Sequence, residues 1–276
     1  MRMGTFGFPA MDSDRYAVVL LILSLATRSL SQSVIQIRPE NQNLVASDSI
    51  SGGPRIRRDD SLYCESWRFS VETNDAGLWS QIPARCLGYV QEYMTGERYL
   101  SDSEIVADNS LVFANTVEIA GNGKDAWVFD IDETLLSNVP YYVVHGFGSE
   151  TFDEDSFNDW VYLAEAPALP ASLRLYRELE QLGVKIFLLT GRDEHQRNAT
   201  QKNLVYAGYS NWEKLILRGP SDTGKPASIY KSEKRKELED EGFMIHGSSG
   251  DQWSDLLGFA VATRSFKLPN PMYYIA

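Results

Sequence analysis

The chain has 276 residues, 43% of them hydrophobic, which is enough for one domain of ordinary to large size with its own core and an appended subdomain. Its formal net charge of −12 gives it an acidic surface, which repels nucleic acid and anionic lipid and argues against both as partners. The sequence contains no internal repeat, basic stripe or low-complexity tract.

Residues Ala17–Ala26, AVVLLILSLA, form an apolar run near the N-terminus. This run is too short to span a bilayer, but it matches the apolar region of a secretory signal peptide. Arg2 and Arg15 precede it, and small residues follow it in SLSQS. We expect residues 1–32 to be a signal peptide and the mature chain to have no membrane span. The alternative is an unprocessed apolar tail.

Two cysteines, Cys64 and Cys86, both follow this segment. In the oxidising compartment that a signal peptide implies, such a pair often forms one disulfide; two buried thiols are the alternative. The same route makes Asn198-Ala199-Thr200 a candidate glycosylation site, with Asn198 as the acceptor, although a helix is expected there.

Residues 33–60 are polar, contain GGP and RIRRDD, and are expected to form a loose leader. The next segment, 61–121, has apolar residues at roughly helical spacing. It is predicted to form a helical extension with helices over 62–78, 81–95 and 101–120.

From Lys124 onward, short apolar runs alternate with longer helical patterns. One helix is expected between Pro170 and Gly183, because a proline opens and a glycine closes a stretch with leucines along one face. Strands that alternate with helices predict a parallel sheet in an α/β fold, with ligands at the carboxyl ends of the strands. The predicted strands cover 126–131, 184–190, 214–219, 243–247 and 264–268.

Polar residues stand at the ends of three of these strands. The first ends in Asp130-Ile131-Asp132, the second in Thr190-Gly191-Arg192, and the fourth is followed by Asp251 and then by Asp255. Each group alone has an ordinary explanation, such as a strand-end turn or the start of a helix. Together they predict a site where carboxylates bind a hard cation such as Mg²⁺ and backbone N–H groups cradle a phosphate.

A phosphate beside carboxylates also needs a positive side chain nearby. Lys231 lies in YKSEKRKELEDE, near the start of the helix before the fourth strand, and Lys225 and Lys234 compete with it for this role. Most of this stretch is expected to be a solvated, charged helix face.

The ordered set Asp-x-Asp-x-Thr, Leu-Thr-Gly-Arg, a lysine and Gly-Asp-x-x-x-Asp resembles the motifs of the haloacid dehalogenase-like (HAD) phosphohydrolases, and it is specific as a set. Four more stretches, YCESWRFSVETN, YKSEKRKELEDEGF, GDQWSDLLG and FKLPNPMYYIA, are similar to the plant acid phosphatases and vegetative storage proteins. The resemblance implies a three-layer αβα HAD fold over 61–276. One departure is the polar run HGSS at 246–249, which leaves the packing of the fourth strand open.

The resemblance implies an acid phosphatase that acts on small phosphomonoesters through an aspartyl-phosphate intermediate. Asp130 would attack the phosphorus atom, and Asp132 would protonate the leaving alcohol and then deprotonate the attacking water. The segment Thr190–Arg192 would bind the phosphoryl group, and Lys231 would neutralise its charge.

The same resemblance implies a bound Mg²⁺. Its protein ligands would be Asp130, the backbone carbonyl of Asp132 and the carboxylate of Asp251. Asp255 would mainly hold these ligands in position through its own contacts.

Residues 139–168 lie between the first two strands, where this superfamily places a cap over the site. The aromatic residues Tyr141, Tyr142, Phe147 and Trp160 would line an apolar wall for the substrate, or would only pack the insert. A short cap of this kind is compatible with a broad range of phosphomonoesters.

Two other functions fit parts of the pattern. The first is nitrogen storage, which some relatives perform; the retained motif residues favour activity, and the two roles can coexist in one chain. The second is a receiver-like phosphate-binding module, whose acidic groups also stand at strand ends but without the second aspartate of Asp-x-Asp. The family implies a secreted or vacuolar location, and a homodimer is compatible with the sequence.

Overall fold

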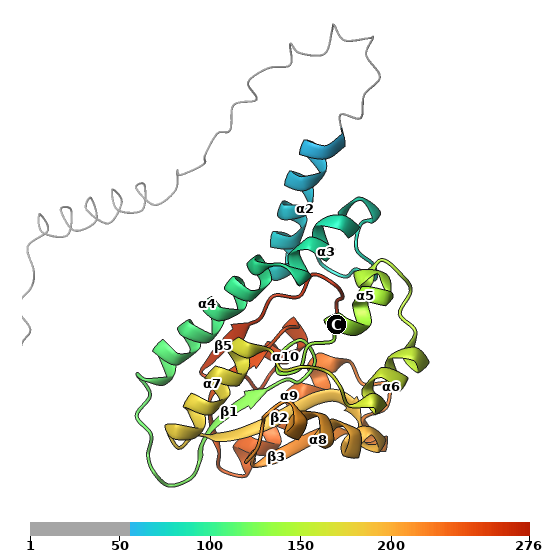
Figure 1. Ribbon diagram of the computed structural model, residues 1–276. Coiled ribbons are helices and arrows are strands. Elements are labelled where there is room, and N and C mark those ends of the chain that lie inside the picture. The colour runs from blue at the N-terminus through green and yellow to red at the C-terminus, as the bar shows by residue number, and fades with distance from the viewer. Residues whose placement is uncertain (1–55) are drawn as a thin grey trace, which may run out of the picture. The chain divides into compact units, whose positions relative to one another are not determined.

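The computed structural model of the protein describes residues 56–276, which belong to one compact unit (Figure 1). The predicted signal peptide at 1–32 and most of the predicted leader at 33–60 lie outside the described residues. Within 56–276, every helix is too short or too polar to cross a bilayer.

A sheet of five parallel strands forms the centre of the unit, in the order β3-β2-β1-β4-β5. The middle strand, β1, is buried along its whole length, as expected for a parallel sheet with both faces covered. The predicted α/β class is confirmed, and all five predicted strands are present with ends shifted by a few residues. They are β1 (Asp125–Phe129), β2 (Lys185–Asp193), β3 (Lys214–Arg218), β4 (Met244–Gly250) and β5 (Arg264–Lys267).

Helices cover both faces of this sheet and give it three layers (Figure 1). On one face, Trp127 of β1 belongs to a core cluster with residues of α4 (Glu97–Ala114) and α7 (Pro170–Gln181). On the other face, Val128 packs with residues of α9 (Ala227–Asp240). Trp127 and Val128 pack against different helical layers because consecutive side chains of a strand point to opposite faces of the sheet.

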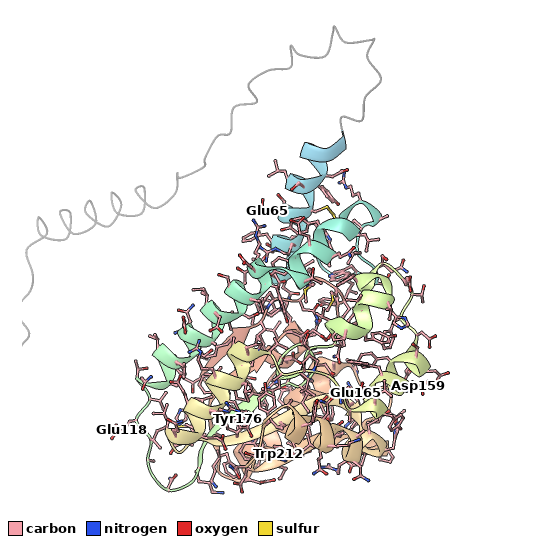
Figure 2. All side chains as sticks on the ribbon, viewed as in Figure 1. Glu65, Glu118, Asp159, Glu165, Tyr176 and Trp212 are labelled. Atoms are coloured by element: carbon pink, nitrogen blue, oxygen red, sulfur yellow. A yellow bond between two sulfur atoms is a disulfide. The ribbon has the colours of Figure 1, made fainter. Side chains whose placement is uncertain are left out.

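Tyr176 of α7 fixes one of these layers on the sheet (Figure 2). Its fully buried ring lies 5.9 Å from the ring of Phe129 and 5.1 Å from that of Tyr209, measured between centroids. Its hydroxyl donates a hydrogen bond of 2.7 Å to the carbonyl of Ser210, which satisfies the polar end of the side chain.

The polar run in β4 has a packing explanation. Asp125 of β1 shares a hydrogen bond of 2.8 Å with Nε2 of His246, and the indole nitrogen of Trp127 donates a 3.0 Å hydrogen bond to the hydroxyl of Ser249. A Cβ atom at Gly247 would lie 2.5 Å from the Trp127 ring, so only glycine fits there. The strand therefore continues to Gly250, beyond the predicted end at 247, because its polar groups are bonded to β1.

The helices of the N-terminal extension are shifted from their predicted positions. The first, α2 (Ile56–Glu72), begins within the predicted leader and ends six residues before the predicted end at 78. Two residues after its end, Asn74 adopts a left-handed conformation with φ of 66°, which does not continue a helix. The second, α3 (Leu87–Thr95), begins later than expected because Pro83 is extended and a single 3₁₀ turn follows it. The third, α4, covers Glu97–Ala114 instead of 101–120.

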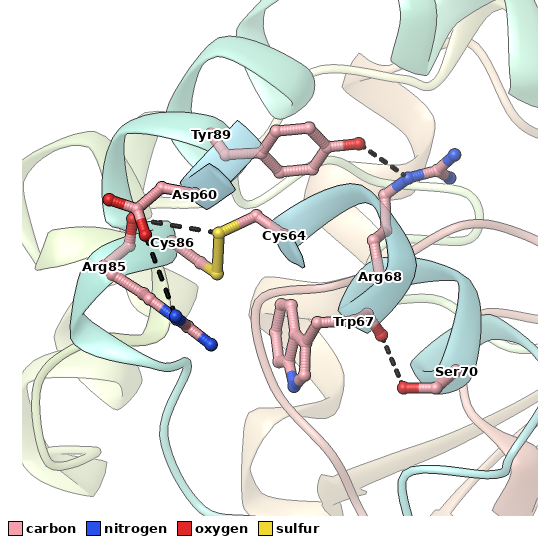
Figure 3. Close-up of a disulfide and its surroundings, with 8 residues drawn as sticks. All are labelled: Asp60, Cys64, Trp67, Arg68, Ser70, Arg85, Cys86 and Tyr89. Atoms are coloured by element: carbon pink, nitrogen blue, oxygen red, sulfur yellow. Dashed lines mark hydrogen bonds and ion pairs between the residues drawn. A yellow bond between two sulfur atoms is a disulfide. The ribbon is translucent and has the colours of Figure 1, made fainter. Parts of the chain in front are cut away.

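A disulfide between Cys64 and Cys86 joins α2 to the 3₁₀ turn (Ala84–Cys86) that precedes α3 (Figure 3). It closes a loop with a sequence separation of 22 residues, and both cysteines are buried. The guanidinium of Arg85 lies over the ring of Tyr63 beside it, at 3.1 Å from the centroid. The pairing expected for an oxidising compartment is the one that the structure contains, and the alternative of two buried thiols is wrong.

The insert between β1 and α7 contains α5 (Val139–Val144), a 3₁₀ turn and α6 (Glu154–Leu163). Of its aromatic residues, Tyr141, Tyr142 and Phe147 are all buried. The rings of Tyr141 and Tyr142 pack against Phe157 and Tyr273, respectively. This burial favours a packing role for these side chains over an exposed substrate wall.

Candidate active site

The carboxyl ends of β1, β2 and β4 bring the predicted residues together. Asp130 directly follows β1 and donates its backbone N–H to the carbonyl of Ser249 in β4, at 2.9 Å. Asp251 directly follows β4, and Asp255 lies one turn later in the short helix α10 (Trp253–Leu256). One carboxylate oxygen from each of the three aspartates lies within 4.8 Å of the others, and all three residues are buried. A Cβ atom at Gly250 would lie 2.3 Å from that of Asp255, so glycine allows this close approach.

Lys231 of α9 is the lysine that reaches these carboxylates. Its ammonium group lies 2.5 Å from an oxygen of Asp130 and also bonds to Asp255. Its side chain is only 6% exposed. Lys225 pairs instead with Asp222 and Glu233, and Lys234 pairs with Glu237, so neither of these two competes for Asp130 in the structure.

Burial is the main cause of the shifted pKa values of Asp130 and Asp251. It raises the pKa of Asp130 well above its usual range, against the attraction of Lys231 and with help from Asp255 and Asp251. It also raises the pKa of Asp251 to about 7, again with help from Asp255. The pKa of Lys231 is raised despite its burial, because two carboxylates hold its proton. One ammonium cannot neutralise three buried carboxylates, and a set of oxygen ligands with excess negative charge fits a hard divalent cation.

Asp132 is held apart from this group by Arg192. The guanidinium contacts both carboxylate oxygens, at 2.7 Å from Nη2 to Oδ1 and 3.0 Å from Nε to Oδ2, and Asn138 adds a 2.9 Å bond to Oδ1. Burial favours the protonated form of Asp132, but the charge and hydrogen bonds of Arg192 outweigh it and lower the pKa. Arg192, which was expected to bind the phosphoryl group, thus directs its guanidinium to Asp132 and, at 3.1 Å, to the hydroxyl of Thr200.

Thr190 and Gly191 lie in β2, at its carboxyl end. The Thr190 side chain is buried, and its oxygen accepts a 3.1 Å hydrogen bond from the backbone N–H of Arg192. Gly191 is exposed. Asn198 lies elsewhere, on the exposed side of α8 (Arg197–Tyr206), and the structure does not bring it into the site.

Glu133 is a site residue that the sequence analysis missed. It is fully buried in a left-handed conformation with φ of 51°. It accepts a 2.5 Å bond from the backbone N–H of Asn138 and a 2.6 Å bond from the hydroxyl of Tyr273. Burial, with help from Asp132, raises its pKa to about 7. Its signal in the sequence was its place in the Asp-x-Asp-Glu-Thr motif, directly after Asp132. That motif was interpreted from its two aspartates alone.

Two amides that hold Asp251 were also missed. Gln252 and Asn270 each donate a 2.7 Å hydrogen bond to the same oxygen of Asp251. Asn270 is itself fixed through its backbone N–H by Glu72, the last residue of α2, at 3.0 Å. The N-terminal extension therefore supports the site through the C-terminal segment.

The raised pKa values predict that the metal-free protein loses stability as the pH rises. Glu133 and Asp251 hold their protons more tightly in the folded than in the unfolded chain, with folded pKa values of about 7 against 4.5 and 3.8. Their contribution is complete below the unfolded values and is lost as the pH rises through the folded ones. With a chelator present, we expect a lower melting temperature at about pH 7.5 than at about pH 5.

Magnesium should reverse this loss, because a cation binds the ionised carboxylates of the folded chain. Melting curves with and without Mg²⁺ at both pH values measure the effect. In Asp251→Asn, we expect a smaller dependence on pH and a smaller stabilisation by Mg²⁺. Equal melting temperatures at both pH values in the wild type would contradict the proton affinities described above.

The chain is similar to known proteins over most of its length. The family model of the HAD superfamily, subfamily IIIB (acid phosphatase), matches residues 53–276. The chain is 49% identical over 258 residues to "Acid phosphatase 1" of Solanum lycopersicum, which covers 94% of this chain and 97% of that protein. It is 38% identical over 216 residues to "Vegetative storage protein 2" of Arabidopsis thaliana, covering 77% of this chain and 80% of that protein.

A solved structure of similar fold is the class C acid phosphatase from Bacillus anthracis. It superposes with a TM-score of 0.58 at 27% identity and covers 68% of this chain and 85% of that chain. The same enzyme with tungstate bound superposes with a TM-score of 0.54 at 26% identity, with the same coverage.

Proposed function

This chain belongs to the acid phosphatases of HAD subfamily IIIB, and we propose that it hydrolyses phosphate monoesters through a phosphorylated Asp130. The observation that carries this mechanism is the contact between Asp130 and Lys231 within a buried group of carboxylates. A lysine at this position neutralises a carboxylate that must approach an anionic phosphate.

The two aspartates of the motif divide the chemistry. A carboxylate oxygen of Asp130 attacks the phosphorus atom, the bond from phosphorus to the leaving oxygen breaks, and Asp132 gives its proton to that oxygen. Water then attacks the phosphorylated Asp130 and gives a proton to Asp132, which releases inorganic phosphate and restores both carboxyl groups. The arginine contact suits the base step, and the charge of a bound phosphate raises the proton affinity of Asp132 for the acid step.

Mg²⁺ would be held by Asp130, Asp251 and the backbone carbonyl of Asp132. Asp255 would support this site, since its carboxylate accepts hydrogen bonds from Lys231 and from the backbone N–H of Gln252. The cation, when bound, screens the repulsion between the carboxylates and the phosphate. Thr190 and the backbone of Gly191 would bind phosphoryl oxygens at the end of β2. The tungstate bound to the Bacillus enzyme, an oxyanion like phosphate, is consistent with this role.

We further propose a secreted or vacuolar location, which the disulfide and the similarity to a vegetative storage protein support. Glycosylation at Asn198 and a homodimer remain compatible with this location. Storage of nitrogen is the second candidate function, because two relatives are named vegetative storage proteins. A storage role predicts massive accumulation and degradation on demand, and it can coexist with activity.

Hydrolysis of p-nitrophenyl phosphate by the purified mature chain tests the proposal. We expect turnover that a chelator abolishes and that Mg²⁺ restores, because the carboxylate group carries more negative charge than Lys231 can neutralise. The measurement covers acidic to neutral pH, with folding checked by circular dichroism. If folded protein with Mg²⁺ showed no turnover anywhere in this range, storage would replace hydrolysis as the leading function.

A further inference from the structure

Asn138 connects the insert to the acid–base residue. It lies at the start of α5, is fully buried, and contacts Asp132, Glu133 and Trp160 through one side chain. We propose that Asn138 is a positioning residue that fixes the carboxylate of Asp132, and that Trp160 of α6 fixes Asn138 in turn. This inference rests on the proposed role of Asp132 in proton transfer.

The donors and acceptors around Asn138 determine which way its amide faces. The indole nitrogen of Trp160 can only donate, and it lies 2.8 Å from Oδ1 of Asn138. The carboxylates of Asp132 and Glu133 accept, and they lie 2.9 Å and 3.1 Å from Nδ2. A reversed amide would point its oxygen at two carboxylates, so the Trp160 contact helps to hold the amide in the orientation that binds Asp132.

This orientation makes the two oxygens of Asp132 unequal. Oδ1 accepts from Arg192 Nη2 at 2.7 Å and from Asn138 at 2.9 Å, while Oδ2 accepts from Arg192 Nε at 3.0 Å. Among the described residues, Oδ1 therefore has more donors than Oδ2, and without Asn138 both oxygens would be held by Arg192 alone.

A second contact between α6 and the core provides a matched control. Asn158 of α6 accepts a 2.7 Å hydrogen bond from Gln196, which follows β2 and does not contact Asp132. Loss of this bond would loosen α6 without changing the partners of Asp132. Removal of the Trp160 contact therefore tests the orientation of Asp132, and removal of the Asn158 contact tests only the attachment of α6.

The test compares kcat/KM for an alkyl phosphate with that for p-nitrophenyl phosphate, since kcat/KM covers the steps up to release of the alcohol. A poor leaving group needs the proton of Asp132, and p-nitrophenolate leaves with little help. For Asn138→Ala, we expect kcat/KM to fall by about 10–100-fold on the alkyl substrate and much less on the aryl one. For Trp160→Phe, which keeps the ring, we expect a selective fall of about 3–10-fold on the alkyl substrate. Asn158→Ala should change both substrates equally.

Asp132→Asn separates the inference from the proposed function. If Asp132→Asn lost the two activities equally, the acid role itself would be wrong. Asp132→Asn could instead lose more kcat/KM on the alkyl than on the aryl substrate, while Trp160→Phe, like Asn158→Ala, changed both equally. The acid role of Asp132 would then stand, and the positioning role of Asn138 and Trp160 would be wrong. Asn138→Ala leaves Glu133 with fewer donors and can lower stability, so the folded Trp160→Phe variant decides between these results.

Discussion

The Asp130→Asn variant is expected to lose turnover by on the order of 10⁴-fold or more, because an amide cannot attack phosphorus in place of the carboxylate. The substitution keeps the shape of the side chain and removes a buried carboxyl group whose pKa is raised by burial. Lys231 keeps Asp255 as its partner, and the group loses one of its excess carboxylates. The fold should therefore be retained, with a melting temperature equal to or above that of the wild type at neutral pH. Initial rates with p-nitrophenyl phosphate and melting curves measure both effects.

Asp159→Asn is a suitable control for this comparison, because Asp159 is exposed on α6 (Figure 2). We expect it to keep wild-type turnover. Substantial turnover by a deamidation-free preparation of Asp130→Asn would remove Asp130 from the nucleophile role.

The Lys231→Met variant should lose both activity and stability. Methionine has a similar length but carries no charge, so the carboxylates of Asp130 and Asp255 would lose their buried cationic partner. Removal of one partner from a buried ion pair costs about 3–5 kcal/mol, and loss of a group that stabilises transition-state charge costs about 10²–10³-fold in rate. Urea unfolding at neutral pH measures the first effect, and kcat/KM measures the second.

Lys234→Met on the same helix is the matched control. Lys234 pairs with Glu237, whose side chain is 58% exposed, and such a pair contributes at most about 1 kcal/mol. We expect its stability and rate to remain near those of the wild type. If Lys231→Met were as stable and active as Lys234→Met, the buried ion pair would not have the role described here.

The sequence predicted the parallel sheet and the residues at its strand ends because both depend on local patterns. Short apolar runs marked the strands, and parallel strands bring their carboxyl ends to one edge. Asp130, Asp251 and Asp255 meet there as a direct consequence. The helix ends of the N-terminal extension were less accurate, because Asn74 follows an early end of α2 and Pro83 delays the start of α3, where the apolar spacing alone predicts helix.

The partners of the site residues could not be predicted in the same way. Arg192 and Asp132 are 60 residues apart in the chain, and Tyr273 and Glu133 are 140 apart. Such pairs depend on how distant segments pack, and a local motif does not contain that information. The sequence predicted Arg192 as part of a phosphate-binding segment, but it did not indicate that the Arg192 guanidinium contacts Asp132. The polar residues of β4 were unexpected for the same reason, since His246 and Ser249 find their partners, Asp125 and Trp127, on the neighbouring strand.

The most direct measurement is to trap the phosphorylated enzyme. Asp132→Asn, turning over p-nitrophenyl phosphate with Mg²⁺, lacks the base for hydrolysis of the intermediate and should accumulate it. After rapid quenching in acid, mass spectrometry of the peptides should find one phosphoryl group on the peptide that carries Asp130, and hydroxylamine should remove it. A phosphoryl group on any other residue, or none during measurable turnover, would contradict the mechanism.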